Sequence, residues 1–466
     1  MSFFDKITNN LPEVAGPTQK KLGFNEKLKW TLIILVLFFI LGVIPLYGLG
    51  GNALERFEIL SVILGAKFGS IISLGIGPIV TASIVLQLLN GSGIWKFDLA
   101  SDEGKKRFQG IQKLMALFFI LFEAAIYVFM GGLSPEAGIS PWLLVFQLIV
   151  GGILIMFLDE VVSKWGFGSG ISLFIAAGVS QSILVRALSW LPSPNNPEIS
   201  AGAIPALFQS VSAGDPITAT LMLAGIIATL AVFVIAVYAQ AMKVEIPLSF
   251  GRVRGHGIRW PLSFIYTSNI PVILVAALLA NIQLWGRLAQ NMAVASGGKL
   301  MTWLSVYVLG QVGTAASGHG LVEWVNAPNL IRALITGAVN SKVMANSIIY
   351  ILIMMGGSVL FSIFWVQTSG MDAKSQAKQM MSSGLQLPGF RRDERILERV
   401  LNRYIWPLTV MGALTVGFLA AFADLSGALS SGTGLLLTVM IVYKLYEEIA
   451  KQHMMDMNPM MRKFME

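Results

Sequence analysis

The sequence predicts an all-α, polytopic membrane protein with ten transmembrane helices. Of its 466 residues, 55% are hydrophobic and only 12% are charged, whereas charged residues make up about a quarter of an average soluble domain. The mean hydropathy is +0.72. Apolar runs of about 20 residues recur along the chain, and each is long enough to cross a bilayer as a helix. A transmembrane β-barrel would instead show short segments of alternating hydrophobicity.

The apolar runs set the expected order of the spans and the topology. The first run is followed by no small-residue cleavage site, so it predicts a retained helix and not a signal peptide. Most of the 33 Lys and Arg fall in the two tails and in alternate loops, which by the positive-inside rule places both termini in the cytoplasm. The ten predicted spans are 29–49, 70–90, 111–131, 141–161, 170–189, 217–240, 262–286, 345–367, 404–424 and 433–450.

Residues suited to catalysis or metal binding are scarce. The chain has no cysteine, which excludes disulfides, thiolate nucleophiles and cysteine metal sites. Its three histidines, His256, His319 and His453, fall in loops and in the C-terminal tail. The sequence contains neither a phosphate-binding loop of the P-loop type nor a His-Glu-x-x-His motif. We therefore expect no cofactor, no metal and no enzymatic activity, and energy must come from a partner or a gradient.

One stretch, residues 51–89, does not behave as ordinary membrane helix. Its first half mixes apolar residues with Glu55, Arg56 and Glu58 and is too short and too charged to cross a bilayer. Its second half is apolar enough to cross but is interrupted by Gly75 and the Gly77-Pro78 pair. A short, partly polar helix leading into a broken span indicates a membrane interior that does not simply face lipid.

A faint internal repeat relates the two parts of the chain. Gly77-Pro78 in the second span is matched by Pro271 in the seventh, and each proline is followed by β-branched residues. The fifth span opens with Gly-Ser-Gly-Ile at 168–171 and the tenth with Gly-Thr-Gly-Leu at 432–435. Because each part holds five spans, 1–215 and 216–466 have opposite orientations, which places the functional path between them. Either match alone could be chance, since such breaks are common in membrane helices.

The interrupted helices carry uncharged aliphatic side chains where a transport path would run. Residues four apart share one helical face. If these helices line a central path, branched aliphatic side chains would block water and ions by dewetting. Taken singly, each of them is more commonly a core or lipid-facing residue. The candidates are Ile76, Val80, Ile171, Ile175, Ile273 and Leu437.

Ionisable residues within the spans are few, which bears on the alternative functions. Glu123 is the one clear mid-span carboxylate, while Asp159, Glu160 and Asp424 fall at span ends. Charges in the membrane interior are costly and usually functional, so an ion-coupled secondary transporter of a small solute, with Glu123 as its coupling site, stays open. A third possibility is an insertase-like scaffold without a through-pore.

Two basic loops are predicted on the cytoplasmic side, at 241–261 and 368–403. The first carries Arg252 and Arg254 near turn-forming glycines, and the second carries Arg391 and Arg392 before a segment with helical charge spacing. Positive-inside anchoring together with anionic lipid would explain such charge. Clustered Lys and Arg would also suit docking of a large anionic partner such as ribosomal RNA. The length of the second loop favours docking.

Several of these motifs together resemble the SecY family, the pore subunit of the protein-conducting channel. The resemblance covers essentially the whole chain, and spans two, four, five and seven look most like archaeal members. It implies two inverted five-helix halves around a central hourglass pore, a short plug helix, and a location in the cell membrane. It also implies passive translocation of secretory polypeptides and lateral release of transmembrane segments into lipid. The stretches that carry it are Leu74–Ala82, Gly168–Ile171, Leu173–Ile175, Ser268–Ile273 and Gly432–Gly434.

The resemblance also implies roles for particular residues. The six aliphatic candidates match its hydrophobic pore ring, and spans two and three against seven and eight would form a lateral gate. Thr81, Glu123 and Asn281 match a polar cluster at that gate. The arginines of the two loops, Arg252, Arg254, Arg391 and Arg392, match the ribosome-docking surface. The segment 52–67 matches the plug, with Leu54, Phe57, Leu60, Ile63 and Leu64 as its apolar residues.

The partners implied by the resemblance are a SecE/gamma subunit, a beta (SecG-like) subunit and the ribosome. The signal recognition particle receptor pathway, signal sequences, nascent chains and membrane lipid complete the expected set. No cofactor is implied.

Overall fold

A computed structural model describes most of the chain and a helix in every predicted span. Residues 53–64 fall outside it, so Leu54, Phe57, Leu60, Ile63 and Leu64 of the predicted plug lie outside the described residues. Arg252, Arg254, Arg391 and Arg392 lie outside them too. The described residues are 11–18, 22–52, 65–91, 94–95, 97, 102–193, 199–250, 257–267, 270–296, 303, 320–382, 385–386 and 393–457.

The helices follow the predicted order. Short additional helices are α8 (Ala203–Ala213), α12 (Leu321–Val325), α13 (Leu330–Ile335) and α15 (Ala373–Ser382). Those that fall in the ten predicted spans are α2 (Phe24–Val43), α4 (Gly77–Gly91), α5 (Asp102–Phe129), α6 (Pro141–Trp165), α7 (Gly170–Leu188), α9 (Pro216–Ala241), α10 (Ile270–Ser296), α14 (Ser341–Thr368), α16 (Glu394–Leu425) and α17 (Gly432–Met457).

Seven of the described helices are long and apolar enough to cross a membrane. The helices in the other three predicted spans, α2, α4 and α17, are too short or too charged to count among these seven. Helix α4 has only 15 residues, α2 begins with Lys27 and Lys29, and α17 carries Lys444 and Glu448. These three helices pack against other helices of the bundle, since α4 contacts α5 and α10, and α17 contacts α2, α7 and α9.

The predicted interruption of the second span is present. Residues 71–76 form successive turns, and the helix begins only at Gly77. Proline disfavours helical geometry in the residue before it and has no N–H to donate, so Pro78 stands at the start of α4. Gly75 has φ +53°, a left-handed conformation that glycine adopts without strain. The second span is therefore a turn segment followed by a short helix.

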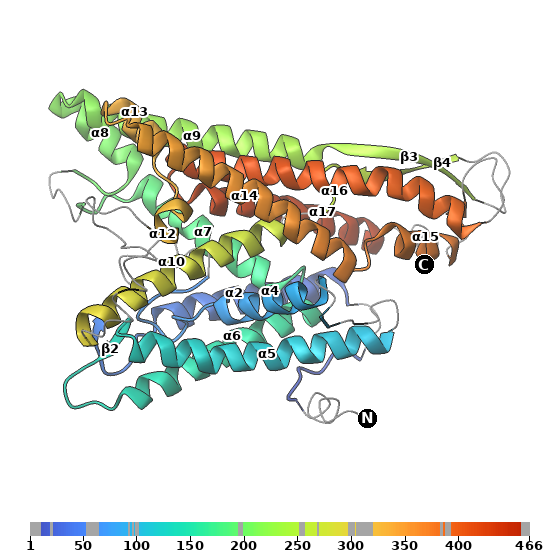
Figure 1. Cartoon of the computed structure of the whole chain (residues 1–466), viewed down its shortest axis with the longest axis horizontal. Helices are drawn as coiled ribbons and strands as arrows, with labels where there is room; N and C mark the ends of the chain where they lie inside the picture. The colour runs from blue at the N-terminus through green and yellow to red at the C-terminus, as the bar shows by residue number, and fades with distance from the viewer. Residues whose placement is uncertain are drawn as a thin grey trace.

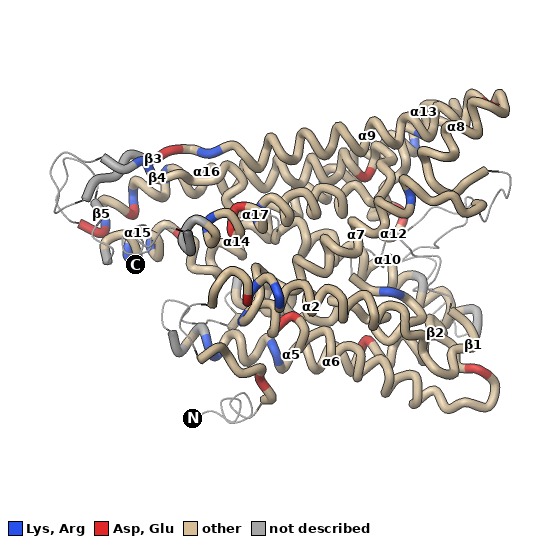
Figure 2. The backbone as a smooth tube through the Cα atoms, turned by 180° about the vertical axis from the view of Figure 1, so that it is seen from behind, with Lys and Arg blue, Asp and Glu red and all other residues tan. Residues whose placement is uncertain are grey.

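The helices form two groups side by side along the long axis (Figure 1). Helices α2, α4, α5 and α6 lie on one side and α9, α14 and α16 on the other, with α10 running between the groups. The described segments nearest the two ends of the chain, which begin at residue 11 and end at residue 457, lie at the same end of the bundle (Figure 1). Most Lys and Arg of the described residues lie toward that end too (Figure 2).

A small sheet joins the two basic loops that the sequence treats as separate. Strands β3 (Lys243–Phe250) and β4 (Gly257–Ser263) pair antiparallel, and β5 (Leu385–Gln386) pairs with β3. Buried side chains of this sheet, α15 and α16 share one apolar cluster that includes Ile246, Ala377 and Leu401. The two loops thus form a single structured unit beyond the helix ends (Figure 1). A second, shorter pair, β1 (Leu49–Asn52) with β2 (Leu133–Pro135), is also antiparallel.

Candidate functional site

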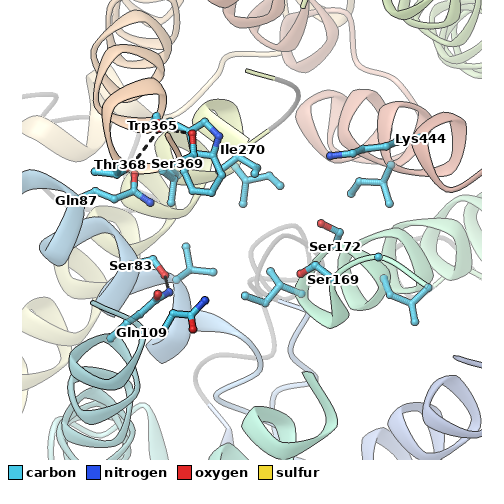
Figure 3. A pocket seen from close by; sticks show the side chains of 18 of the residues that line it. Ser83, Gln87, Gln109, Ser169, Ser172, Ile270, Trp365, Thr368, Ser369 and Lys444 are labelled. Atoms are coloured by element: carbon cyan, nitrogen blue, oxygen red, sulfur yellow. Dashed lines mark hydrogen bonds between the residues drawn. The ribbon is translucent and has the colours of Figure 1, made fainter. Parts of the chain in front are cut away.

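A cavity of about 480 Å³ lies where α4, α5, α7, α10, α14 and α17 come together. Its wall carries serine, threonine and glutamine side chains from several helices (Figure 3). Val80, Ile171 and Ile273, three of the predicted ring residues, line it too. The polar and charged residues that line the cavity are Ser83, Gln87, Gln109, Gln112, Ser169, Ser172, Thr368, Ser369, Lys444 and Glu448.

The six predicted ring residues all lie in or against one large apolar cluster. Each of the five fully buried ones is at most 6% exposed, and all five belong to one apolar cluster. Ile171 is half-buried and packs against the same cluster. The five buried residues are Ile76, Val80, Ile175, Ile273 and Leu437. Ring residues from both halves of the sequence therefore share this cluster, and Val80, Ile171 and Ile273 also line the cavity.

The ring residues occupy similar positions relative to the starts of their helices. Ile76 directly precedes α4, Ile171 is the second residue of α7, and Ile273 is the fourth residue of α10. Leu437 follows the start of α17 by little more than one turn. The four glycine- and proline-marked breaks seen in the sequence thus place the ring residues near the first turns of four helices.

The predicted polar cluster also forms, and it ties α4 to helices on both sides. Asn281 Nδ2 of α10 donates to Thr81 Oγ1 of α4 at 3.1 Å. Thr81 Oγ1 lies 3.1 Å from Glu123 Oε1 of α5 and 2.9 Å from the carbonyl oxygen of Gly77. All three side chains are buried, with 7% exposure or less. Such hydrogen bonds between membrane helices contribute about 1 kcal/mol each.

The polar cluster is not saturated. Within the described residues, Glu123 Oε2 and the Tyr127 hydroxyl are buried without a hydrogen-bond partner. Buried polar atoms nearly always have a partner, so these two groups can each form a further hydrogen bond at this helix interface. Helix α4 also packs against α14, which places the cluster between α4 and α5 on one side and α10 and α14 on the other.

The polar wall of the cavity is the part of the site that the sequence analysis did not identify. Gln112 Nε2 donates to Ser83 Oγ at 2.6 Å, and Gln87 Oε1 is buried without a partner in the described part of the chain. A signal was available, because 76, 80, 83 and 87 follow the four-three-four spacing of one helical face. The aliphatic ring residues and the polar wall of α4 therefore share one stripe.

Among the described residues, no group of three His, Asp or Glu side chains is arranged to hold a metal ion. The arginines predicted to dock a ribosome lie outside the described residues. Their surroundings are described, however. The β3–β4 strands flank Arg252 and Arg254, and Asp393, whose carboxylate accepts the Arg395 N–H at 2.9 Å, caps α16 just after Arg392.

Comparison with known proteins identifies a family. The profile of the family SecY matches residues 70–446. The protein translocase subunit SecY of Methanothermobacter thermautotrophicus is 46% identical, over 99% of this chain and 98% of its own. The subunit of the same name from Methanocaldococcus jannaschii is 42% identical, over 98% of each chain.

Solved structures give the same answer at the level of the fold. A protein-conducting channel is 41% identical and superposes with a TM-score of 0.81, over 96% of this chain and 97% of its own. Sec61 in the canine ribosome-channel complex from the endoplasmic reticulum is 40% identical, with a TM-score of 0.78 over 96% of this chain and 97% of its own. With the profile match and these near full-length relatives, the chain belongs to the SecY family.

Proposed function

We propose that this chain is the pore-forming subunit of a channel that translocates secretory polypeptides and releases transmembrane segments sideways into lipid. The proposal is supported by the cavity, which Val80, Ile171 and Ile273 line, and by the apolar cluster that holds Ile76, Val80, Ile175, Ile273 and Leu437. Aliphatic side chains offer no ligands to ions and exclude water from a narrow constriction. They can still move aside for a passing chain by changes of rotamer and helix position.

The lateral gate would lie between α4 and α5 of the 1–215 half and α10 and α14 of the 216–466 half. The contacts of α4 with α10 and α14 support this assignment, as do the hydrogen bonds of Thr81 with Glu123 and Asn281. A signal sequence would enter here and displace interactions worth about 1 kcal/mol each. Sufficiently apolar segments would then leave into lipid, because burial of their apolar surface favours it.

The end of the bundle that holds both termini would face the cytoplasm. The concentration of Lys and Arg at that end supports this orientation (Figure 2). The unit of β3, β4, β5, α15 and α16 would then be part of the docking surface for the ribosome, together with the predicted docking residues Arg252, Arg254, Arg391 and Arg392 of the same two loops. We propose that the channel contains a SecE/gamma subunit and a beta subunit and lies in the cell membrane. Substrates would be delivered through the signal recognition particle receptor pathway. Residues 53–64 would belong to the plug.

A crosslinking scan tests the function directly. Photo-crosslinkers placed at Ile76, Ile175 and Leu437 should capture a stalled secretory chain, while one at Phe233, half of whose side chain is exposed on α9, should not. Equal capture at all positions would contradict a through-pore. Solute uptake driven by an ion gradient in liposomes, without capture of secretory chains, would instead support the transporter that Glu123 leaves open.

Replacing Asn281 with leucine should let less apolar segments enter the membrane. The change removes the hydrogen bond that joins α10 to Thr81, about 1 kcal/mol of resistance to gate opening. We therefore expect the hydrophobicity threshold for insertion to fall by about two leucines in a test segment, since each contributes roughly 0.5 kcal/mol. The measurement is the inserted fraction across a graded series of segments.

Thr409→Val is the matched control for the gate variant. Thr409 is also buried, but its hydroxyl donates to the carbonyl oxygen of Ile405 in its own helix, at 2.8 Å. It should leave the threshold unchanged. Glu123→Leu should lower the threshold like Asn281→Leu, and an unmoved threshold in both would remove the polar cluster from gating.

Replacing Arg391 and Arg392 with glutamate should weaken ribosome binding. Reversing two charges removes phosphate contacts and adds repulsion, so we expect about tenfold weaker binding near physiological salt, with a shallower salt dependence. Co-sedimentation of the purified complex with ribosomes is the measurement. Arg332→Glu is the control, because Arg332 is an exposed residue of α13, which lies at the opposite end of the bundle. This variant should bind ribosomes normally. Equal binding by the unaltered protein, the double variant and the control would count against the docking surface.

A further inference from the structure

Two carboxylates outside the ring and the polar cluster hold the first turns of α7 and α17. Asp159, near the end of α6, accepts the backbone N–H of Ile171 at 2.9 Å through Oδ1. Asp424, near the end of α16, accepts the N–H of Thr433 at 2.8 Å through Oδ1. The second oxygen of Asp424 accepts the hydroxyl of Tyr350 at 2.8 Å and also bonds the Thr433 hydroxyl.

The two arrangements are counterparts in the internal repeat. Helices α6 and α7 are the fourth and fifth spans of the first half, and α16 and α17 the fourth and fifth of the second. In each case a carboxylate late in one helix reaches the first residues of the next. Because the halves are inverted, the two contacts lie toward opposite faces of the membrane. Chance packing would not be expected to produce the same contact at both repeat-related positions.

A glycine at each helix start permits this approach. A side chain on Gly170 would put its Cβ 2.5 Å from Asp159 Cα. A Cβ on Gly432 would lie 1.9 Å from the backbone carbon of Ala423, next to Asp424. Neither distance is possible for real atoms. The glycines seen in the sequence as helix openers thus let the preceding helix press its carboxylate onto the free N–H groups that every helix start presents.

At α7 the cap comes from a neighbouring helix and not from the residue before the helix. Ser169, which precedes α7, makes no capping hydrogen bond with its side chain. At α17 the preceding residue, Ser431, also accepts the N–H of Gly434 at 3.2 Å, and Asp424 of the neighbouring helix adds its contact with Thr433. An ordinary cap fixes only the end of its own helix, whereas Asp159 and Asp424 tie α7 to α6 and α17 to α16. Each contact therefore helps to fix the position of α7 or α17 relative to the helix before it.

The two capped helices carry three of the six ring residues. Asp159 bonds the N–H of Ile171 itself, and Ile175 follows one turn later. Leu437 lies four residues beyond Thr433, about 6 Å along the helix. A shift of either helix start would move these side chains out of the buried cluster that they share with Ile76 and Ile273.

We propose that Asp159 and Asp424 are paired positioning residues that hold the pore ring closed, one from each face of the membrane. This inference rests on the proposed function of the ring. Loss of either carboxylate should loosen the seal without removing any ring side chain.

The test measures ion conductance of the reconstituted complex in planar bilayers. Asp159→Ala and Asp424→Ala should each raise the resting conductance several-fold. Asp424→Asn keeps one acceptor oxygen and should fall between Asp424→Ala and the unaltered channel; it carries the test if the alanine variant does not fold. Asp215→Ala is the matched control, because Asp215 caps α9 through the N–H groups of Ile217 and Thr218 within its own helix, and α9 carries no ring residue.

A second measurement separates helix position from general instability. The chain has no cysteine, so single cysteines at Ala176 in α7 and Thr438 in α17 report each helix separately. Both positions are 7% exposed. Asp159→Ala should speed thiol labelling at 176 more than at 438, and Asp424→Ala should do the reverse. A merely destabilised protein would show equal increases at both, which would overturn the inference.

The failure of this inference and the failure of the ring can be told apart. Normal conductance in both alanine variants, alongside a leak in a channel whose ring residues Ile76 and Ile273 are replaced by glycine, would overturn the positioning role and leave the ring intact. Normal conductance in the ring variant itself would overturn the ring, and the positioning role with it.

Discussion

A channel in which Ile76 and Ile273 are both replaced by glycine is expected to conduct ions at rest. The two side chains are 1% and 6% exposed and come from opposite halves of the chain. Removing both opens the apolar constriction beside the cavity, so that water can fill it, and we expect the resting conductance to rise about tenfold or more. Planar-bilayer recording of the purified complex, without ribosome or substrate, measures this.

The control must separate loss of the ring side chains from the general destabilisation that glycine causes in a membrane protein. Val36 on α2 and Leu352 on α14 are 57% and 62% exposed, and glycine there should lower helix stability by about 1 kcal/mol per site. Of the two ring positions only Ile273 lies within a helix, so the control should lose at least as much helix stability as the ring variant. The doubly substituted control should conduct no more than the unaltered channel. If the ring variant leaks no more than this control, the aliphatic cluster is a packing core and not a seal.

The spans were predictable because hydropathy over about 20 residues is a strong local signal. Two helices begin later than predicted. The seventh begins at Ile270 and not at 262, since residues 262 and 263 belong to β4, and the second begins at Gly77 and not near residue 70. The break itself was visible in Gly75 and Pro78. The extent of the break was not, because the turns at 71–76 pack closely against Gly151 and Gly152 of α6, more than 60 residues later in the chain.

The ring candidates came from the interrupted helices, but only the family resemblance singled them out, since buried aliphatic residues are common in any membrane bundle. The polar cluster was identified through the resemblance alone. In the structure the polar cluster is hydrogen-bonded, and the ring residues lie in or against one apolar cluster. Their roles stay predictions, as do those of the plug residues and loop arginines that lie outside the described residues.

The sheet of β3, β4 and β5 was not predicted. Pro247 and Pro261 argue against regular strands, and β5 is two residues long. Strand β5 pairs with β3 at Ser249 and Phe250. At Pro247, β3 is therefore paired with β4 alone and does not have to form hydrogen bonds to a second strand. The carboxylate caps were missed for a related reason. Asp159 and Asp424 looked like ordinary span ends, and their partners become apparent only when consecutive helices pack together.

Replacing Gly151 with valine is expected to prevent normal folding of the pore. Gly151 is buried in α6, where an added Cβ would lie 1.9 Å from the carbonyl oxygen of Ile71. Helix α6 therefore rests directly on the turn segment 71–76, whose last residue is the ring residue Ile76. The segment would have to move away, at a cost of about 3 kcal/mol or more for overpacking a buried contact with backbone. The yield of monodisperse protein and its thermal stability in detergent should both fall.

Gly356→Ala is the matched comparison, because it also adds a Cβ to a glycine within a membrane helix. Gly356 in α14 is exposed, and a Cβ there meets nothing within 4 Å. Since alanine is the better helix former by about 1 kcal/mol, this variant should be as stable as the unaltered protein or more so. Gly151→Ala should show the steric effect with the smallest possible side chain. If Gly151→Ala matched Gly356→Ala in stability, α6 would not be the support of the 71–76 segment, and the position of Ile76 would have to be set from the α4 side alone.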